Sequence, residues 1–329
     1  MNEIQSSIHN QGPLIGSPDW GESKIWFYKD LSVHFRVSGN ESNPPIVLIH
    51  GFGASSDHWR NNAEIFAAEG FRVYGIDLIG FGRSAQNLQG KINHLDNKIW
   101  ANQLAAFLDE IVDVNRNGKV VLIGNSLGAL TAITTLSQRP ELIRTIIAAP
   151  LPEPVFLNPI KISFPNWLKK GKTFLIKLFF NLFPLKALVN LISRTKLINY
   201  ALQSAYFKSI SNDNFLKRIV TVPARRPNAS KALRSMCIGM SNRKNSTKGP
   251  SIMEKIQNLP NRPPILLIWG KQDKLIPVFL ANKLIKLHPW LKLTVIDKAG
   301  HCLHNELPML FNQTVLKWLK NLKPSKQTI

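Results

Sequence analysis

A serine with the spacing of a nucleophile lies near the middle of the chain. The sequence Gly-Asn-Ser-Leu-Gly at 124–128 follows the aliphatic run 120–123 directly, and a helical pattern continues to about residue 138. A strand, a tight turn and a helix in this order lift a serine hydroxyl clear of the strand end, and the glycines keep side chains out of the crowded turn. The helix N-terminus favours the negative charge that develops in acyl transfer. Ser126 is therefore the predicted nucleophile.

A serine hydroxyl is a poor nucleophile at neutral pH, so it needs a base, and the base needs an acid that orients it. Asp273 lies in the loop after the predicted strand 264–269, and His301 lies in the loop after the predicted strand 291–297. Both loops follow the carboxyl ends of strands, the same sheet edge as Ser126. The sequence thus predicts a Ser126–Asp273–His301 triad.

Two backbone N–H groups are the predicted oxyanion hole: that of Leu127, after the nucleophile, and that of Phe52, in the loop after strand 45–50. A rival for the acid is Glu153, which follows another strand but has a proline on each side. Asp297 is interpreted as a strand residue.

Other polar residues receive structural interpretations. Asp77 is expected to hold the loop 80–84 through side-chain to backbone hydrogen bonds. His304 is expected to bond locally, and Cys302 to be a small buried residue. Packing or surface positions are expected for His58, His94 and His288. The only two cysteines, Cys237 and Cys302, have no metal-binding spacing, so no metal or cofactor is expected.

The elements that must position these residues repeat as strand–helix units. After an antiparallel hairpin over 24–38, the expected strands are 45–50, 71–77, 120–124, 142–149, 264–269 and 291–297. Helical patterns separate them, which predicts an α/β fold with a mainly parallel sheet and helices on both faces. The predicted organisation is an N-terminal arm (1–20), a core (21–150 and 251–329) and a helical insertion (151–250) that forms a lid.

The positive charge is concentrated in this insertion. The whole chain carries a net charge of +22, and segment 155–250 holds eighteen Lys or Arg residues against one acid, Asp213. Between 164 and 193, aromatic and aliphatic residues alternate with lysines, a composition that suits a helix in the interface of an anionic membrane. The alternatives are a lid that only packs over the active site, and nucleic-acid binding, which is not expected because the segment carries no nucleic-acid motif.

Neither a secretory signal nor a membrane span is expected, because residues 1–20 lack an apolar run and no stretch of eighteen uncharged apolar residues occurs. The expectation is a cytoplasmic protein that is not secreted and that binds peripherally to a membrane.

The sequence resembles the α/β-hydrolase superfamily over nearly its whole length. The segments 50–60 (HGFGASSDHWR), 124–128 (GNSLG) and 300–306 (GHCLHNE) resemble the pheophytinase and chlorophyll dephytylase group, although Leu303 and Asn305 depart from its usual pattern. This resemblance implies an α/β-hydrolase fold and hydrolysis of an ester with a long hydrophobic group, such as the phytyl ester of chlorophyll-type pigments in photosynthetic membranes. Lipase, thioesterase or haloperoxidase chemistry, or a non-catalytic binding protein, remain alternatives. The acyl and alcohol groups and the oligomeric state stay open.

Overall fold

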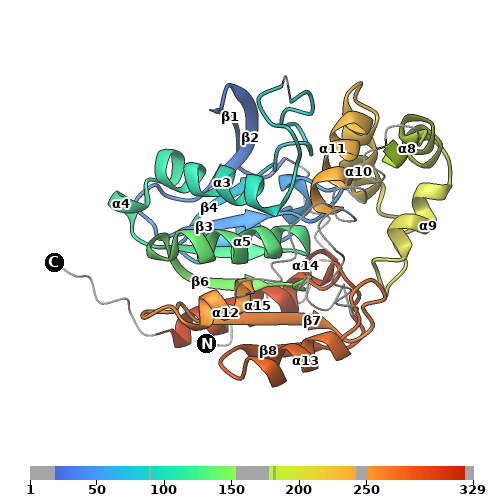
Figure 1. The fold of residues 1–329 in the computed structure, drawn as a ribbon. Coiled ribbons are helices and arrows are strands. Elements are labelled where there is room, and N and C mark those ends of the chain that lie inside the picture. The colour runs from blue at the N-terminus through green and yellow to red at the C-terminus, as the bar shows by residue number, and fades with distance from the viewer. Residues whose placement is uncertain (1–18, 89, 153–177, 181–182, 242–250, 323–329) are drawn as a thin grey trace, which may run out of the picture.

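An eight-stranded sheet runs through the protein, whose computed structural model describes residues 19–88, 90–152, 178–180, 183–241 and 251–322. Its strand order is β1-β2-β4-β3-β5-β6-β7-β8 (Figure 1). The strands are β1 (Glu22–Tyr28), β2 (Leu31–Ser38), β3 (Pro45–Ile49), β4 (Arg72–Ile76), β5 (Val120–Gly124), β6 (Ile143–Ala148), β7 (Ile265–Gly270) and β8 (Lys292–Ile296).

The pairing of these strands confirms the predicted mainly parallel sheet. β1 pairs antiparallel with β2, and β2 antiparallel with β4, while β4, β3, β5, β6, β7 and β8 are parallel neighbours. The hairpin turns through Lys29 and Asp30, both with positive φ (50° and 55°), as a two-residue turn matched to the strand twist requires. The central strands β3, β5 and β7 are buried along their whole length, because helices cover both faces of the sheet.

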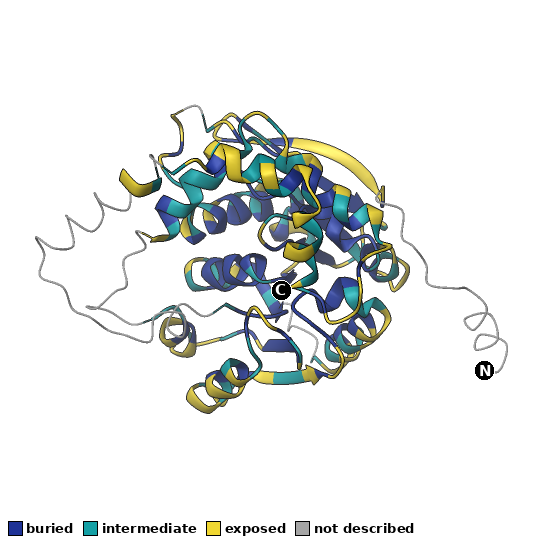
Figure 2. Ribbon diagram, turned by 90° about the vertical axis from the view of Figure 1, so that its right-hand side faces the viewer, coloured by how far each residue is buried: buried dark blue, intermediate teal, exposed yellow. Residues whose placement is uncertain are grey.

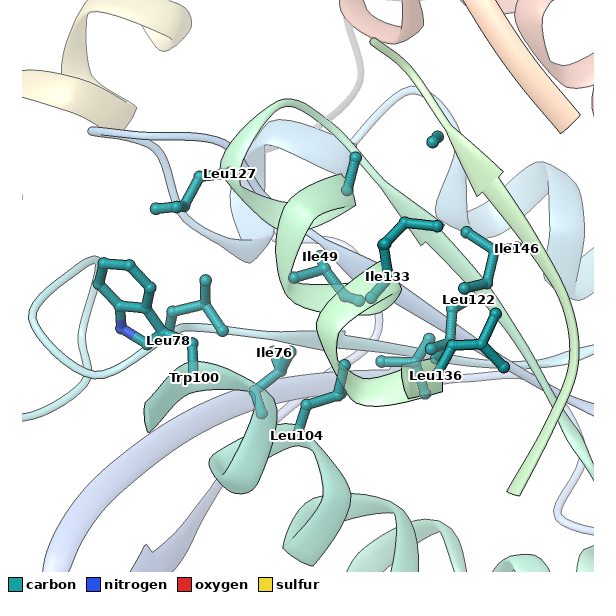
Figure 3. Packing of buried hydrophobic residues seen from close by; sticks show 14 of the residues in the cluster. Ile49, Ile76, Leu78, Trp100, Leu104, Leu122, Leu127, Ile133, Leu136 and Ile146 are labelled. Atoms are coloured by element: carbon teal, nitrogen blue, oxygen red, sulfur yellow. The ribbon is translucent and has the colours of Figure 1, made fainter. Parts of the chain in front are cut away.

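Two hydrophobic cores fill the two faces. One face packs against α3 (Asn97–Phe107), α5 (Leu127–Gln138), α12 (Ile252–Gln257) and α13 (Phe279–Leu287). Figure 3 shows the centre of this core, where Trp100 and Leu104 of α3 and Ile133 and Leu136 of α5 lie against the sheet residues. The other face packs against α2 (Ala63–Ala68) and α15 (Pro308–Asn321). The burial colouring follows these layers, dark blue inside and yellow on the outer helical faces (Figure 2).

Two of the helical patterns that separate the predicted strands, near 95–115 and near 56–69, do not form continuous helices. The helical pattern near 95–115 forms α3 to Phe107, then a π-helical turn over Leu108–Val112 that ends at Asp113 with φ 51°, before the short α4 (Val114–Asn117). The pattern near 56–69 divides into a 3-10 turn, Ser56–Trp59, and α2. All four residues of that turn are buried, and the segment 56–69 forms a short 3-10 turn and α2 in place of one continuous helix.

Helices α8 (Leu185–Arg194), α9 (Leu197–Gln203), α10 (Asn214–Ala224) and α11 (Ala229–Ser241) form the described part of the predicted lid. We call them the cap helices; they gather at one end of the sheet, on the right of Figure 1. The expected division of the chain into arm, core and lid stays a prediction. Most of the apolar segment 164–193, the rival acid Glu153 and residues 1–18 of the arm lie outside the described residues. Trp20, at the end of that arm, is buried and donates from Nε1 to the Ser56 carbonyl (3.1 Å).

Candidate active site

The predicted nucleophile lies in a strained turn between β5 and α5. Ser126 has φ 52° and ψ −110°, in a region that residues other than glycine rarely adopt. The two flanking glycines allow this turn. A Cβ atom on Gly124 would fall 2.4 Å from the Ala129 nitrogen, and one on Gly128 would fall 2.1 Å from the Ile49 carbonyl oxygen. Ser126 thereby stands at the carboxyl end of β5 and at the positive end of α5.

The predicted base and acid are hydrogen-bonded to each other. His301 Nδ1 lies 2.9 Å from Asp273 Oδ2, and both side chains are buried. The other carboxylate oxygen, Oδ1, accepts from the backbone N–H groups of Leu275 (2.9 Å) and Ile276 (2.8 Å). These bonds fix the carboxylate, which in turn orients the imidazole and leaves its Nε2 to act as the basic nitrogen.

A side-chain amide links the histidine loop to the serine turn. Asn125 Nδ2 donates to the main-chain carbonyl of His301 (3.2 Å) and to that of Ala149 (2.6 Å). Since Asn125 directly precedes Ser126, this amide ties the two loops together. The loops of Ser126, Asp273 and His301 therefore lie together at one edge of the sheet.

The histidine loop is also held from the cap side, which the sequence did not predict. The backbone N–H groups of His301 and Cys302 donate to the carbonyl of Ala205, just past α9, at 2.8 and 3.3 Å. A Cβ atom on Gly300 would fall 2.8 Å from that same carbonyl oxygen and 2.8 Å from the Phe207 nitrogen. The chain between the cap helices α9 and α10 thus packs directly on the loop that carries His301.

The two predicted oxyanion donors occupy suitable segments. Leu127 is the first residue of α5, so its N–H has no acceptor within the helix. Phe52 follows β3, and its side chain is 59% exposed while its ring contacts that of Phe81 (centroids 5.8 Å apart). The loop before Phe52 packs on the serine turn, because a Cβ atom on Gly51 would fall 2.5 Å from Asn125 Oδ1.

His50, which sequence reasoning left unassigned, fixes the start of this loop. Its Nδ1 lies 2.7 Å from the Gly51 carbonyl, and its Nε2 accepts from the Leu78 N–H (3.0 Å). Nδ1 therefore donates, and the ring is neutral. Burial lowers the pKa of His50, which agrees with this assignment.

Asp77 holds the loop 80–84, as predicted, and has a further partner. Its Oδ2 accepts from the Arg83 N–H (2.8 Å), and its Oδ1 accepts from the Ser56 N–H (2.6 Å). The unpredicted partner is His34, whose Nδ1 lies 3.0 Å from Asp77 Oδ2. Burial raises the pKa of Asp77, but the hydrogen bonds from His34 and the Ser56 N–H and the neighbouring histidines together outweigh burial, so the pKa lies below its ordinary value.

These contacts create a second serine–histidine–aspartate chain outside the predicted site. Ser23 Oγ lies 2.8 Å from Nε2 of His34, whose Nδ1 contacts Asp77. Ser23 lies on the regular strand β1, whereas Ser126 occupies a strained turn at a helix N-terminus. The second chain therefore lacks the helix end that would favour an oxyanion beside its serine.

His304 lies in a buried network behind the histidine loop, and its side chain contacts His58, which is distant in sequence, instead of the local partner that was expected. Its Nε2 lies 3.3 Å from His58 Nδ1, and His58 Nε2 lies 2.9 Å from the Tyr206 hydroxyl, which donates to Asn305 Oδ1 (3.0 Å). The His304 ring also packs on Trp59 (centroids 4.1 Å apart). Burial is the main cause that lowers the pKa of His58 to about 3 and the pKa of His304 well below its ordinary value. Both rings are therefore neutral structural groups.

The remaining candidates are structural or peripheral. Burial raises the pKa of Cys302 to about 12, so its thiol is unreactive. Asp297 lies just past β8 and accepts from Gln272 Nε2 (2.9 Å), so the interpretation as a strand residue was wrong by one position. His288 contacts Gln257 at the surface.

Neither a metal site nor a membrane span is found in the part of the chain that the structure describes. Among these residues, no three His, Cys, Asp or Glu side chains are grouped so as to hold a metal ion. No helix formed by them is long and apolar enough to cross a bilayer.

Comparison with known proteins supports the same reading of the fold. The family model described as alpha/beta hydrolase fold matches residues 44–306. A 2-hydroxy-6-oxononadienedioate/2-hydroxy-6-oxononatrienedioate hydrolase from Cupriavidus pinatubonensis is 26% identical over 92% of this chain and 96% of its own length. The chloroplastic pheophytinase of Arabidopsis thaliana is 24% identical over 89% of this chain and 65% of its own length. The crystal structure of a carboxylesterase from Bacillus subtilis superposes with a TM-score of 0.65 and 19% identity, covering 92% of this chain and 93% of the other.

Proposed function

The chain belongs to the alpha/beta hydrolase family, and we propose on that premise that it is a serine hydrolase cleaving a carboxylic ester with a long hydrophobic group. The observation that carries the proposal is the buried His301–Asp273 hydrogen bond (2.9 Å) on a loop tied to the strained serine turn. This arrangement supports a nucleophile, a base and an orienting acid, the three groups that acyl transfer to a serine uses.

In the proposed reaction, Ser126 Oγ attacks the ester carbonyl carbon while His301 Nε2 accepts the hydroxyl proton. The N–H groups of Leu127 and Phe52 donate to the oxyanion of the tetrahedral intermediate. Collapse of the intermediate breaks the bond to the alcohol oxygen, which takes the proton from His301. Water then attacks the acyl-serine in the same way and releases the acid. Asp273 keeps the imidazole in the correct tautomer throughout.

The proposed substrate is an isoprenoid or long-chain ester, with the phytyl ester of a chlorophyll-type pigment as the leading candidate. In support, the described cap helices and the segment after α9 expose large apolar side chains at Leu188, Leu191, Leu197 and Phe207, and Phe52 is exposed beside the proposed oxyanion hole. Each CH₂ group buried from the substrate would contribute about 0.8 kcal/mol to binding. A chloroplastic pheophytinase is among the similar proteins, at 24% identity, and this similarity is compatible with the same substrate class.

The deciding experiment measures phytol release from pheophytin and chlorophyll by the purified protein, beside fatty-acid release from acylglycerols and acyl-thioesters. We expect pigment esters to give the highest kcat/KM. Faster hydrolysis of acetate or butyrate esters than of any long-chain ester would contradict the proposed substrate. If every substrate fails and a fluorophosphonate probe does not label the protein, a non-catalytic binding role replaces the hydrolase.

We further propose that the cap helices contact an anionic membrane surface. On α8, exposed Leu188 and Leu191 lie on the same helix as exposed Lys186 and Arg194, a combination that suits the lipid interface. Vesicle binding should require anionic lipid and weaken with salt, because exposed charges are screened over about 10 Å at 0.1 M. Phe179, which is exposed, and Phe180 precede α8 in the chain, and replacing both by Ser should reduce this binding and spare hydrolysis of a small soluble ester. Equal binding to neutral vesicles, or none to either kind, would leave a lid without membrane contact.

A further inference from the structure

A cavity of about 320 Å³ lies between α10 and two core loops. The core contributes Ser55, from the turn that follows Phe52, and Gly82 and Arg83, from the loop that Asp77 holds. The cap contributes Arg218 and Val222 of α10 and Arg226 just beyond it. Ser126 and His301 are not among its lining residues, so the cavity is separate from the candidate active site.

The positive charge of the arginines around this cavity is only partly neutralised by nearby acidic side chains. Arg226 Nη1 donates to the carbonyls of Gly82 (2.8 Å) and Ser84 (2.9 Å), which hold the guanidinium without cancelling its charge. Arg83 is paired with Asp57 (3.1 Å), and Arg36, which also contacts Asp57 (2.7 Å), has a second acid in Asp19 (2.8 Å). The charge that no acid neutralises therefore belongs to Arg226 and Arg218. The cavity therefore has the electrostatic character of an anion site.

Arg218 is the guanidinium most accessible to a ligand. Its side chain is exposed at the cavity wall, and it forms no hydrogen bond or ion pair with the residues that the structure describes. Its neighbour on α10, Lys217, instead donates to the Ser211 carbonyl (2.8 Å). Arg218 can thus bind an anion without breaking a described contact.

Part of the cavity wall is apolar. Ile219, Val222 and Pro223 of α10 line the cavity beside the arginines. A bare inorganic anion would leave these side chains without a partner, whereas a hydrocarbon chain attached to the anion would cover them.

From these features we propose that the cavity is a binding site for an organic anion, a carboxylate or phosphate ester bearing a hydrocarbon chain. Its anionic oxygens accept from Arg218 and Arg83, and its chain lies on Val222 and the neighbouring apolar residues of α10. The site links the cap to the core, because the anion bridges a residue of α10 to a residue of the loop that Asp77 holds. This proposal concerns binding alone and stands whether or not Ser126 is catalytic.

The test is direct calorimetric titration at low ionic strength with hexanoate, hexyl phosphate, inorganic phosphate and hexanol. Hexanoate or hexyl phosphate should bind, whichever source the natural anion has, while hexanol and inorganic phosphate should bind at least about tenfold more weakly. Arg218→Ser should weaken binding of the organic anion about tenfold or more. Arg194→Ser, which removes the same charge from exposed α8, is the matched control and should bind like the wild type.

A second variant keeps the arginines and fills the space. Val222 is exposed, so Val222→Trp should fold normally and block the cavity, and binding should be lost in it as well. Equal affinity in the Arg218→Ser and Arg194→Ser proteins would overturn the proposal. So would hexanol binding as tightly as hexanoate, inorganic phosphate binding as tightly as hexyl phosphate, or no binding of either organic anion to the wild type.

Discussion

The side-chain amide of Asn125 donates to the main-chain carbonyl of His301, with Nδ2 and O 3.2 Å apart. The two residues are 176 positions apart in the chain. Asn125 adjoins the proposed nucleophile and His301 is the proposed base, so one amide sets the position of one loop relative to the other. Its second bond, to the Ala149 carbonyl, anchors the pair to the end of β6.

Replacing Asn125 by Ala should therefore lower kcat about tenfold or more and change KM little, because the variant loses the positioning of His301 and no substrate contact. Asn125→Asp should be at least as damaging, since a carboxylate would face two carbonyl oxygens. Steady-state kinetics with a soluble ester gives both constants. Wild-type kcat in Asn125→Ala would show that other contacts suffice to hold the two loops.

Replacing Ser126 or His301 by Ala should reduce turnover by about 10⁴-fold or more, as in other triads of this kind. Labelling by a fluorophosphonate should disappear in Ser126→Ala. Asp273→Asn should also be severe, since its Oδ2 would no longer be a carboxylate oxygen holding His301 Nδ1.

The second serine–histidine–aspartate chain provides the control for this prediction. Ser23→Ala should keep both labelling and activity, because Asp77 already binds the backbone of Ser56 and Arg83 and serves as a scaffold. If labelling were lost in Ser23→Ala and kept in Ser126→Ala, the nucleophile would have to be reassigned to β1. Glu153→Gln should be milder than Asp273→Asn; the reverse order would move the acid.

Gly128→Ala should destabilise the protein by about 2–3 kcal/mol or more, because the added Cβ would meet the Ile49 carbonyl oxygen at 2.1 Å and backbone cannot move aside cheaply. Gly70→Ala is the matched control, since its Cβ meets nothing within 4 Å and only its φ of +85° is strained. The free energy of unfolding of Gly70→Ala should fall by about 1 kcal/mol. Urea unfolding measures both; equal losses would mean that the serine turn can relax.

The free energy of unfolding should fall as the pH is lowered from about 6.5 toward 4.5. The pKa values of His50, His58 and His304 are lowered in the folded protein, that of His58 to about 3. Below the unfolded pKa of about 6.5, the unfolded chain therefore binds more protons, and each such histidine costs about 1.4 kcal/mol per pH unit. Their contribution to stability is complete above about pH 6.5.

Urea denaturation at several pH values checks this slope, and His58→Gln should make it shallower. The window ends at 4.5 because carboxylates such as Asp77 begin to titrate in the unfolded chain below it. A flat profile between pH 6.5 and 4.5 would contradict the neutral assignment of these rings.

The succession of strands along the chain and the loops that carry the three proposed catalytic residues could be predicted, because each depends on local signals. Ser126 follows an apolar run and precedes a helical pattern, and Asp273 and His301 each follow a strand. The hairpin could also be predicted, from the alternation of apolar and polar residues on both sides of Asp30.

Contacts between distant segments could not be predicted, because no local pattern records a partner. His34 meets Asp77 across 43 positions, and His304 meets His58 across 246. The division of the segment 56–69 was missed for a related reason: burial of a whole turn depends on what surrounds it. The cavity that Arg218 lines likewise exists only where α10 meets two core loops.

The hydrogen bond from the His301 N–H to the Ala205 carbonyl (2.8 Å) bears on how a substrate enters. If the whole cap moved away from the core as one rigid body, the Ala205 carbonyl would separate from the histidine loop. His301 would then lose this hydrogen bond each time the cap opened. The histidine loop keeps this hydrogen bond during substrate entry only if the moving part of the cap ends before Ala205. The chain from Ala205 onward then stays in contact with the loop. The Ala205 carbonyl would then both limit the movement of the cap and hold the loop that carries the proposed base.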